Sequence, residues 1–313
     1  MMKLSTLLLV LCTACLSGCS WINDNYDHCP SGTWIQLTYT YNMLDAEAVT
    51  TQVFDASVFV IDDNGQCVGQ QNVDSFSLQA NQYRIRLPEL PEGTYDILVW
   101  SGGNDPHFRR QEDGMELGEE TQREALGNLF YGRTSSVMVN ESYQIIPVSL
   151  MKDTKRIATT LQLLSGDKEL DTADFQLEIE ANNRKLDAYN LPSGHISYYP
   201  FLHETARLDS LSVVQSGFHT LRLLTGDGTR MRLKHLPTGS QVFDIPLTDY
   251  LVLAGMTDFL HMGEQEYLDR EDHFQLLFFL NETQLPERPY ACTMLQIRSW
   301  IIRLNETELG SHL

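Results

Sequence analysis

The sequence predicts an all-β protein made of two β-sandwich domains. Short segments of alternating apolar and polar residues recur along the chain, and Gly, Pro, Asn and Asp separate them. Strands at this spacing indicate sandwiches rather than a βαβ sheet. The chain has 313 residues, the length of two ordinary domains, and 42% of them are hydrophobic, which is enough for packed cores.

Residues 1–18 are predicted to form a lipoprotein signal peptide. Lys3 precedes an apolar run, Leu7–Leu11, which is too short to cross a bilayer that needs roughly 20 apolar residues. The next residues, Leu16–Cys19 (LSGC), resemble a bacterial lipobox, whose cysteine receives a diacylglycerol and becomes the first mature residue. We therefore predict lipid attachment at Cys19, with acyl chains such as palmitate holding the protein on a membrane. The alternative is an ordinary signal peptide in which Cys19 only happens to lie near the cleavage point.

The first domain is predicted over residues 19–152. In its first strand Ile35, Leu37 and Tyr39 should share one face, because side chains alternate along a strand. After the second strand, Asn64 and Gly65 predict a tight type I′ hairpin turn. Strands are expected at 33–39, 58–61, 83–87, 93–100 and 138–150, and a short helix at 122–129, where Thr121 and Glu124 have capping-box spacing.

The second domain is predicted over residues 153–313. It follows a polar stretch at 151–156 that is not rich in Gly or Ser, so the two domains should be held stiffly. Strands are expected at 157–164, 175–180, 211–214, 218–224, 231–233, 242–245, 274–280 and 294–304.

The charge balance excludes some partners. The chain has 22 Lys and Arg against 42 Asp and Glu, a net charge of -20. Such a surface repels phosphate backbones, so no nucleic-acid partner is expected. It also repels anionic membranes, so membrane attachment requires a hydrophobic or covalent anchor. No C-x-x-C pair is present for a zinc site, and neither a metal nor a cofactor is predicted.

No catalytic motif stands out, and we predict that the protein is not an enzyme. G-x-S-x-G is absent, and Ser193–His195 and Ser216–Phe218 are interpreted as turns. The acidic residues within 264–272 are interpreted as a solvated loop, with a cation site as the alternative. Tyr198–Phe201 could stack on a sugar ring, although packing at a sandwich corner is the favoured interpretation.

Three cysteines remain besides Cys19 in the mature chain. Cys29 precedes the first strand and Cys67 follows the hairpin turn, so a bridge would close a loop of about 38 residues and stabilise the fold by about 3–4 kcal/mol. The oxidising cell envelope favours this disulfide. Three reduced, buried thiols are the alternative. Cys292 is expected to be a small core residue.

Several segments, in order, resemble the fimbrium anchoring-subunit lipoproteins of the Bacteroidota. The resemblance covers nearly the whole mature chain. It rests on Cys19, Asp27–Pro30 (DHCP), Leu37–Tyr41 (LTYTY), Val58–Gly65 (VFVIDDNG), Gly93–Gly102 (GTYDILVWSG), Glu266–Asp272 (EYLDRED) and Ser299–Arg303 (SWIIR).

This resemblance implies two transthyretin-like β-sandwich domains, a place at the outer membrane and a role at the base of a fimbrium. Its partners would be fimbrial shaft subunits, bound by strand complementation at an open edge or groove. The alternative is a surface glycan-binding lipoprotein. That function needs exposed, coplanar aromatic rings, whereas Trp34, Trp100 and Trp300 are at strand positions typical of cores.

The same resemblance suggests how the polymer would end. Shaft subunits of this kind are trimmed after a basic residue, which removes the lipid and the first strand. Here no Lys or Arg occurs between Lys3 and Arg84, so a protease that requires a cationic side chain has nothing to bind. We therefore predict that the chain keeps its lipid at Cys19 and its first strand, and terminates the fimbrium.

Overall fold

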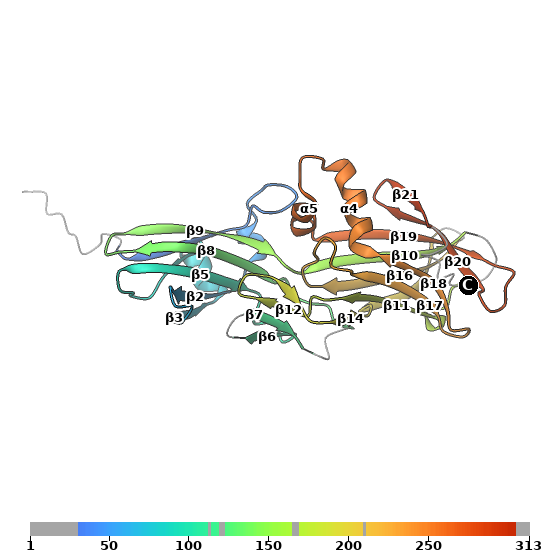
Figure 1. Cartoon of the computed structure of the whole chain (residues 1–313), viewed down its shortest axis with the longest axis horizontal. Helices are drawn as coiled ribbons and strands as arrows, with labels where there is room; N and C mark the ends of the chain where they lie inside the picture. The colour runs from blue at the N-terminus through green and yellow to red at the C-terminus, as the bar shows by residue number, and fades with distance from the viewer. Residues whose placement is uncertain (1–30, 112–113, 119–122, 165–168, 209–210, 305–313) are drawn as a thin grey trace, which may run out of the picture.

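Strands with alternating apolar and polar residues build two β-rich halves, which lie end to end along the long axis of the molecule (Figure 1). The computed structural model of the chain describes residues 31–111, 114–118, 123–164, 169–208 and 211–304. The two halves correspond to the two sandwiches expected from the sequence, and the all-β fold class is confirmed.

One seven-stranded sheet forms the first half. Strand β9 pairs with β1 as far as Ser149 and then with β8 from Leu150 onward, so the sheet folds over on itself. Two short helices, α2 (Val49–Gln52) and α3 (Ser75–Ala80), connect its strands. The strand order is β3 (Cys67–Val73), β2 (Ala56–Asp62), β5 (Gly93–Ser101), β8 (Phe130–Val139), β9 (Gln144–Lys152), β1 (Thr33–Thr38) and β4 (Arg84–Arg86).

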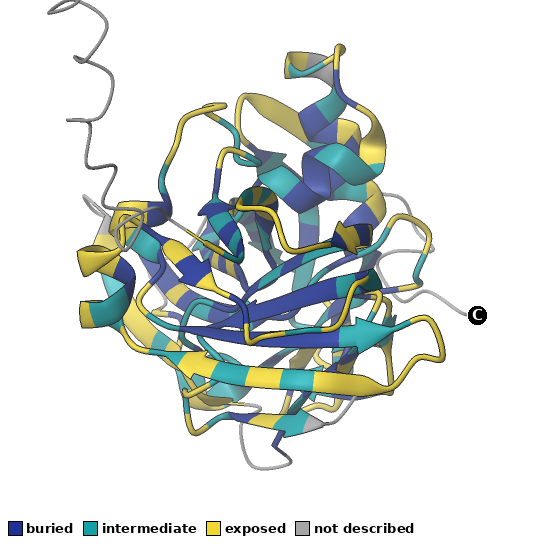
Figure 2. Ribbon diagram, turned by 90° about the vertical axis from the view of Figure 1, so that its left-hand side faces the viewer, coloured by how far each residue is buried: buried dark blue, intermediate teal, exposed yellow. Residues whose placement is uncertain are grey.

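The core of this half follows the alternation of the sequence. Ile35, Leu37 and Tyr39 are each no more than 1% exposed, as predicted, and they meet Val58 and Val60 of β2 inside the fold. Buried and exposed residues alternate along the strands in Figure 2. Burying apolar side chains from both layers is the main favourable contribution to such a sandwich.

Two sheets pack face to face in the second half, and Phe243 of one stacks on Phe278 of the other with ring centroids 4.2 Å apart. The six-stranded sheet has the order β15 (Leu202–Leu208), β16 (Leu211–Thr220), β10 (Lys155–Leu163), β19 (His273–Glu282), β20 (Tyr290–Ile297) and β21 (Trp300–Arg303). The four-stranded sheet has the order β14 (Ile196–Tyr198), β11 (Phe175–Ala181), β17 (Arg230–His235) and β18 (Ser240–Pro246). Three helices accompany them: η4 (Thr172–Asp174), α4 (Leu247–Asp258) and α5 (Glu264–Arg270).

A fourth sheet contains strands from both halves. Its order is β13 (Pro192–Ser193), β12 (Lys185–Asp187), β7 (Gly114–Leu117) and β6 (Phe108–Gln111). Leu186 of β12 pairs with Met115 of β7, and both side chains are buried. Gly114 permits this approach, because a Cβ there would lie 1.9 Å from the carbonyl oxygen of Leu186. The two halves are therefore joined by a shared sheet as well as by the chain itself.

Several sequence predictions about local structure are wrong. Of the helix predicted at 122–129, residue 122 lies outside the described residues and Arg123 has 3₁₀ conformation, but 124–129 form no helix: this segment is irregular, and Leu126 and Leu129 are buried in the core instead. The stretch 138–150 contains a turn and belongs to two strands, β8 and β9, while 211–220 is one strand. Ser216–Phe218 accordingly lies inside β16 and is not a turn.

The hairpin at Asn64 and Gly65 exists, but its turn is not type I′. Only Gly65 has a positive φ, +77°, and its N–H donates to the carbonyl oxygen of Asp62 at 2.9 Å, as in a type I turn. A bulge follows between β2 and β3. The Asp62 carboxylate accepts from the N–H groups of Asn64 and Gln66, which stabilises this longer loop.

Candidate functional site

The first strand, β1, lies between two other strands of its sheet. It pairs with β9 in parallel from Thr33 to Thr38 and with β4 in antiparallel fashion from Trp34 to Gln36. The Tyr39 ring that follows packs edge-on against Phe130, with centroids 5.0 Å apart, and burial raises the pKa of its hydroxyl. Strand β1 therefore occupies the position between β4 and β9, where its removal would leave an open groove.

The predicted cysteine sites are only partly within the described residues. Cys19 and Cys29 lie outside them. Cys67 is exposed at the first residue of β3. The structure places Cys292 in the core, where burial raises the pKa of its thiol to about 12 and keeps it protonated.

The start of β1 and the start of β3 lie on either side of the same short segment, Leu87–Pro88. The N–H of Leu87 donates to the carbonyl oxygen of Thr33 at 2.9 Å. On the other side, a Cβ on Gly69 would lie 3.0 Å from Pro88. Because Cys29 precedes the described chain by two residues, this arrangement is compatible with a bridge to Cys67, which stays a prediction.

The aromatic residues considered for sugar binding do not form a platform. Tyr198 is 1% exposed, and its hydroxyl donates to Asn183 at 2.8 Å. The guanidinium of Arg123 covers the neighbouring Tyr199 ring at 4.5 Å. The expectation about the tryptophans is correct for Trp100, which is buried. It is wrong for Trp34, which is only partly buried, and for Trp300, which is 45% exposed at an edge strand.

The acidic residues within 264–272 are not a solvated loop, which corrects the sequence interpretation. All five of them lie in α5 or directly after it, and Asp269 and Glu271 are buried. The Asp269 carboxylate accepts two hydrogen bonds from Arg222, at 2.8 and 2.9 Å, and Glu271 pairs with Arg298. The segment packs here because each buried charge has a partner of opposite sign.

These ion pairs surround the connection between the two halves. Strand β9 ends at Lys152 and β10 begins at Lys155, so only Asp153 and Thr154 join them, and all four residues are buried. Lys152 pairs with Asp272 at 2.5 Å. The Lys155 ammonium donates to the carbonyl oxygens of Asp269 and Glu271, at 2.7 and 3.0 Å. The predicted stiff connection is therefore a buried polar network, which we call the junction (residues 152–155, Asn190, Arg222 and 269–272).

Burial changes the proton affinity of two junction groups in opposite directions. It raises the pKa of Asp153 and lowers the pKa of Lys155 to about 8, because an apolar environment disfavours both charges. Arg222 also donates to the carbonyl oxygen of Asn190 at 2.6 Å, which connects the loop after β12 to the same network. None of these roles was predicted, because 151–156 was interpreted only as a polar boundary.

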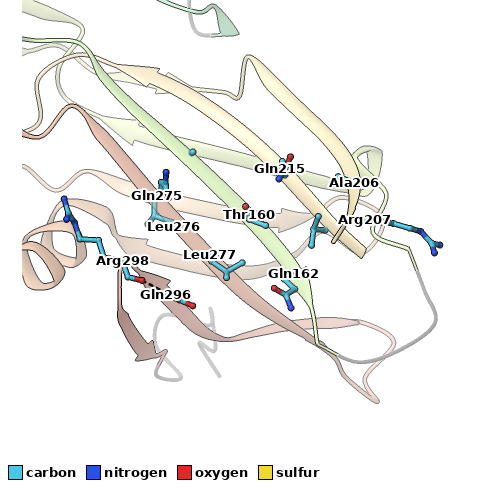
Figure 3. Close-up of a pocket in the computed structure, with 12 residues that line it drawn as sticks. Thr160, Gln162, Ala206, Arg207, Gln215, Gln275, Leu276, Leu277, Gln296 and Arg298 are labelled. Atoms are coloured by element: carbon cyan, nitrogen blue, oxygen red, sulfur yellow. Dashed lines mark hydrogen bonds between the residues drawn. The ribbon is translucent and has the colours of Figure 1, made fainter. Parts of the chain in front are cut away.

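A groove of about 360 Å³ lies on the outer face of the six-stranded sheet (Figure 3). Arg207 and Arg298 line it, and so do glutamine side chains from four strands: Gln162, Gln215, Gln275 and Gln296. Gln296 donates to the carbonyl oxygen of Arg298 at 2.9 Å (Figure 3). Within the described ranges, no cluster of His, Cys, Asp and Glu could hold a metal ion. No helix in the described part of the chain has the length and apolar character to span a bilayer.

Some known proteins are similar to this chain in both sequence and architecture. The family described as "Fimbrillin-A associated anchor proteins Mfa1 and Mfa2" matches residues 26–306. The chain belongs to this family. The resemblance seen in the sequence is thereby confirmed.

Individual proteins are similar to this chain in sequence and fold. The minor fimbrium anchoring subunit Mfa2 of Porphyromonas gingivalis is 21% identical over 318 residues, which cover 94% of this chain and 92% of that protein. A candidate adhesin from Bacteroides thetaiotaomicron is 26% identical with a TM-score of 0.75, covering 88% of this chain and 99% of the other. The solved structure of the Porphyromonas gingivalis anchor Mfa2 has the same fold, with a TM-score of 0.69, 17% identity, and coverage of 88% of this chain and 100% of that one.

Proposed function

We propose that this anchor-family protein is a non-enzymatic, lipid-anchored subunit that attaches the base of a fimbrium to the outer membrane and ends the polymer. The observation that carries the proposal is that β1 is packed and paired within its own sheet. Its inward-facing Ile35 and Leu37 are 0% exposed, its backbone is paired on both sides, and no Lys or Arg precedes it after Lys3. A subunit that keeps this strand cannot accept a partner's strand in the same groove.

The direction of the molecule supports a role between membrane and fimbrium. Thr33 pairs with Gln144 beside the β8–β9 turn, at the end of the molecule farthest from the second half (Figure 1). A lipid at Cys19 would therefore hold the first half near the bilayer and direct the second half outward. Shaft subunits would then bind the second half, by strand complementation at one of its open edges.

N-terminal mapping of protein extracted from outer membranes tests this proposal. We expect acylated Cys19 as the first residue and an intact β1. The Cys19→Ala variant should lose membrane attachment and release fimbriae into the medium, whereas Cys12→Ala, which changes a cysteine of the signal peptide, should behave as wild type. A delipidated N-terminus within residues 20–83 on fimbria-associated protein, or firm attachment of fimbriae in Cys19→Ala, would contradict the proposal.

We also propose that Cys29 and Cys67 form a disulfide that fastens the segment before β1 to the start of β3. Non-reducing peptide mapping should find the two cysteine peptides joined, and Cys67→Ala should lower the free energy of unfolding by about 3–4 kcal/mol. Cys292→Ala is the control, since it should leave the mapped bridge unchanged. Labelling of both Cys29 and Cys67 by a thiol reagent in denaturant without reductant would rule the bridge out.

A further inference from the structure

Two oxygen atoms at the junction are buried without a hydrogen-bond partner. The side chains of Asp153 and Asn190 are 0% and 1% exposed. Asn190 Nδ2 donates to Asp153 Oδ1 at 2.8 Å. Within the described residues, Asp153 Oδ2 and Asn190 Oδ1 have no partner. The two acceptors left over therefore belong to a pair of groups that one hydrogen bond already joins.

A single proton would satisfy both atoms. A carboxylic acid and a primary amide are complementary, because the amide N–H donates to one acid oxygen while the acid O–H donates to the amide oxygen. An ionised Asp153 would instead leave two buried acceptors without donors, and each buried, unpaired acceptor is costly. The two unpartnered oxygens thus favour the neutral form of Asp153, whereas the hydrogen bond from Asn190 Nδ2 by itself lowers the pKa of this carboxyl.

The neighbouring charges do not pair with Asp153. Lys155 on β10 donates to two backbone carbonyls, and Arg222 after β16 donates to Asp269 on α5 and to the Asn190 carbonyl oxygen. Their positive charges lower the pKa of Asp153, whereas the negative charge of Asp269 raises it. The Tyr131 hydroxyl of β8 donates to the Ala188 carbonyl oxygen at 3.0 Å, and the charge of Asp153 raises the pKa of this hydroxyl. Burial outweighs the cations and raises the pKa of Asp153 to about 7.

We propose that Asp153 is a neutral carboxylic acid paired with Asn190, and that this acid–amide pair is a proton-dependent clasp at the junction. Asp153 belongs to the two-residue connection, and Asn190 belongs to the loop after β12, the strand that pairs with β7 of the first half. Asn190 has a positive φ of +61°, a conformation that asparagine tolerates better than most residues. Loss of the proton to solvent at alkaline pH opens the pair and loosens the joint between the halves.

The sign of the pH dependence follows from this assignment. The pKa of Asp153 is higher in the folded than in the unfolded chain, so the folded state retains the proton over the interval between the two values. The stabilisation is complete below about pH 4 and declines as the pH rises to about 7. Across that interval the unfolding constant increases by up to about tenfold per pH unit.

Asp153→Asn tests the clasp in the full mature chain, because asparagine reproduces the neutral acid and can pair with Asn190 at every pH. We expect the ratio of the wild-type unfolding constant to that of Asp153→Asn to rise between about pH 4 and 7, by up to about tenfold per unit, and then level off. Asp63→Asn, which removes an exposed carboxylate from the β2–β3 turn, should follow the wild type. A ratio that does not change with pH, or a variant that is destabilised most above pH 7, would overturn the proposal.

Infrared spectroscopy gives an independent test on the wild-type protein. At pH 6 exposed carboxyl groups are ionised, so the carbonyl band of a neutral carboxylic acid reports a buried acid such as Asp153. We expect this band in wild type and in Asp63→Asn, and its loss in Asp153→Asn. Absence of the band from folded wild-type protein would show that Asp153 is charged, whether or not Asp153→Asn folds.

Discussion

Asp269→Asn is expected to lower the free energy of unfolding by about 3–5 kcal/mol. The change removes the negative charge that holds Arg222, whose side chain is only 13% exposed. It also turns an amide N–H, which cannot accept a hydrogen bond, toward the guanidinium of Arg222, which then loses one of its two hydrogen bonds to residue 269. The positive charge then remains buried at the junction, close to Lys155. Urea titration of both proteins provides the measurement.

An exposed ion pair in the same half provides the matched control. Glu169 pairs with Arg207 at the surface, with more than half of each side chain exposed. Glu169→Gln should cost less than about 1 kcal/mol, because water screens this pair. Replacing Arg222 by Met and Asp269 by Leu together should recover much of the loss, since no buried charge is left alone. Equal, small losses for Asp269→Asn and Glu169→Gln would mean that the junction pair contributes little.

Leu37→Ala is expected to destabilise the first half by about 2–5 kcal/mol. The Leu37 side chain of β1 is 0% exposed, so its truncation leaves a cavity between the two layers of the sandwich. Thermal unfolding of the mature chain measures the loss. Because β1 fills its own groove in the proposed anchor, the variant should also become sensitive to proteases in the segment before Arg84.

Thr38→Ala on the outer face of β1 is the control for this prediction. Thr38 is partly exposed, so its truncation should change the free energy of unfolding by no more than about 0.5 kcal/mol. If Leu37→Ala were as mild as Thr38→Ala, β1 would be only loosely held. The first strand could then leave the groove without a protease, and the argument for a permanently closed groove would fail.

The strands of the first half were predictable because apolar and polar residues alternate along a half-buried strand. Ile35, Leu37 and Tyr39 stand out at a period of two, and the structure buries all three. Helix α4 was not predictable in this way. Its sequence LVLAGM at 251–256 is a continuous apolar run, which a helix and a buried strand share, so periodicity does not distinguish them.

The junction could not be predicted from local sequence. Lys152, Asp153 and Lys155 form a polar run that is typical of an exposed linker. They are buried because their partners Asn190, Arg222 and Asp269 come from segments distant in the chain, and no pattern within one segment indicates such a pairing. The acidic segment 264–272 was misinterpreted for the same reason, since its buried charges pair with arginines from the turn after β20 and from the loop after β16.

The parallel pairing of β1 with β9 has a mechanical consequence. Strand β9 leads through two residues into β10, which is again parallel to its neighbour β19. A pull between the start of β1 and the second half would drag β1 and β9 in opposite directions along their common axis. The ladder from Thr33 to Thr38 would then be loaded in shear, with its hydrogen bonds sharing the tension and breaking together instead of one after another. A first strand held in this geometry resists extraction along its own length.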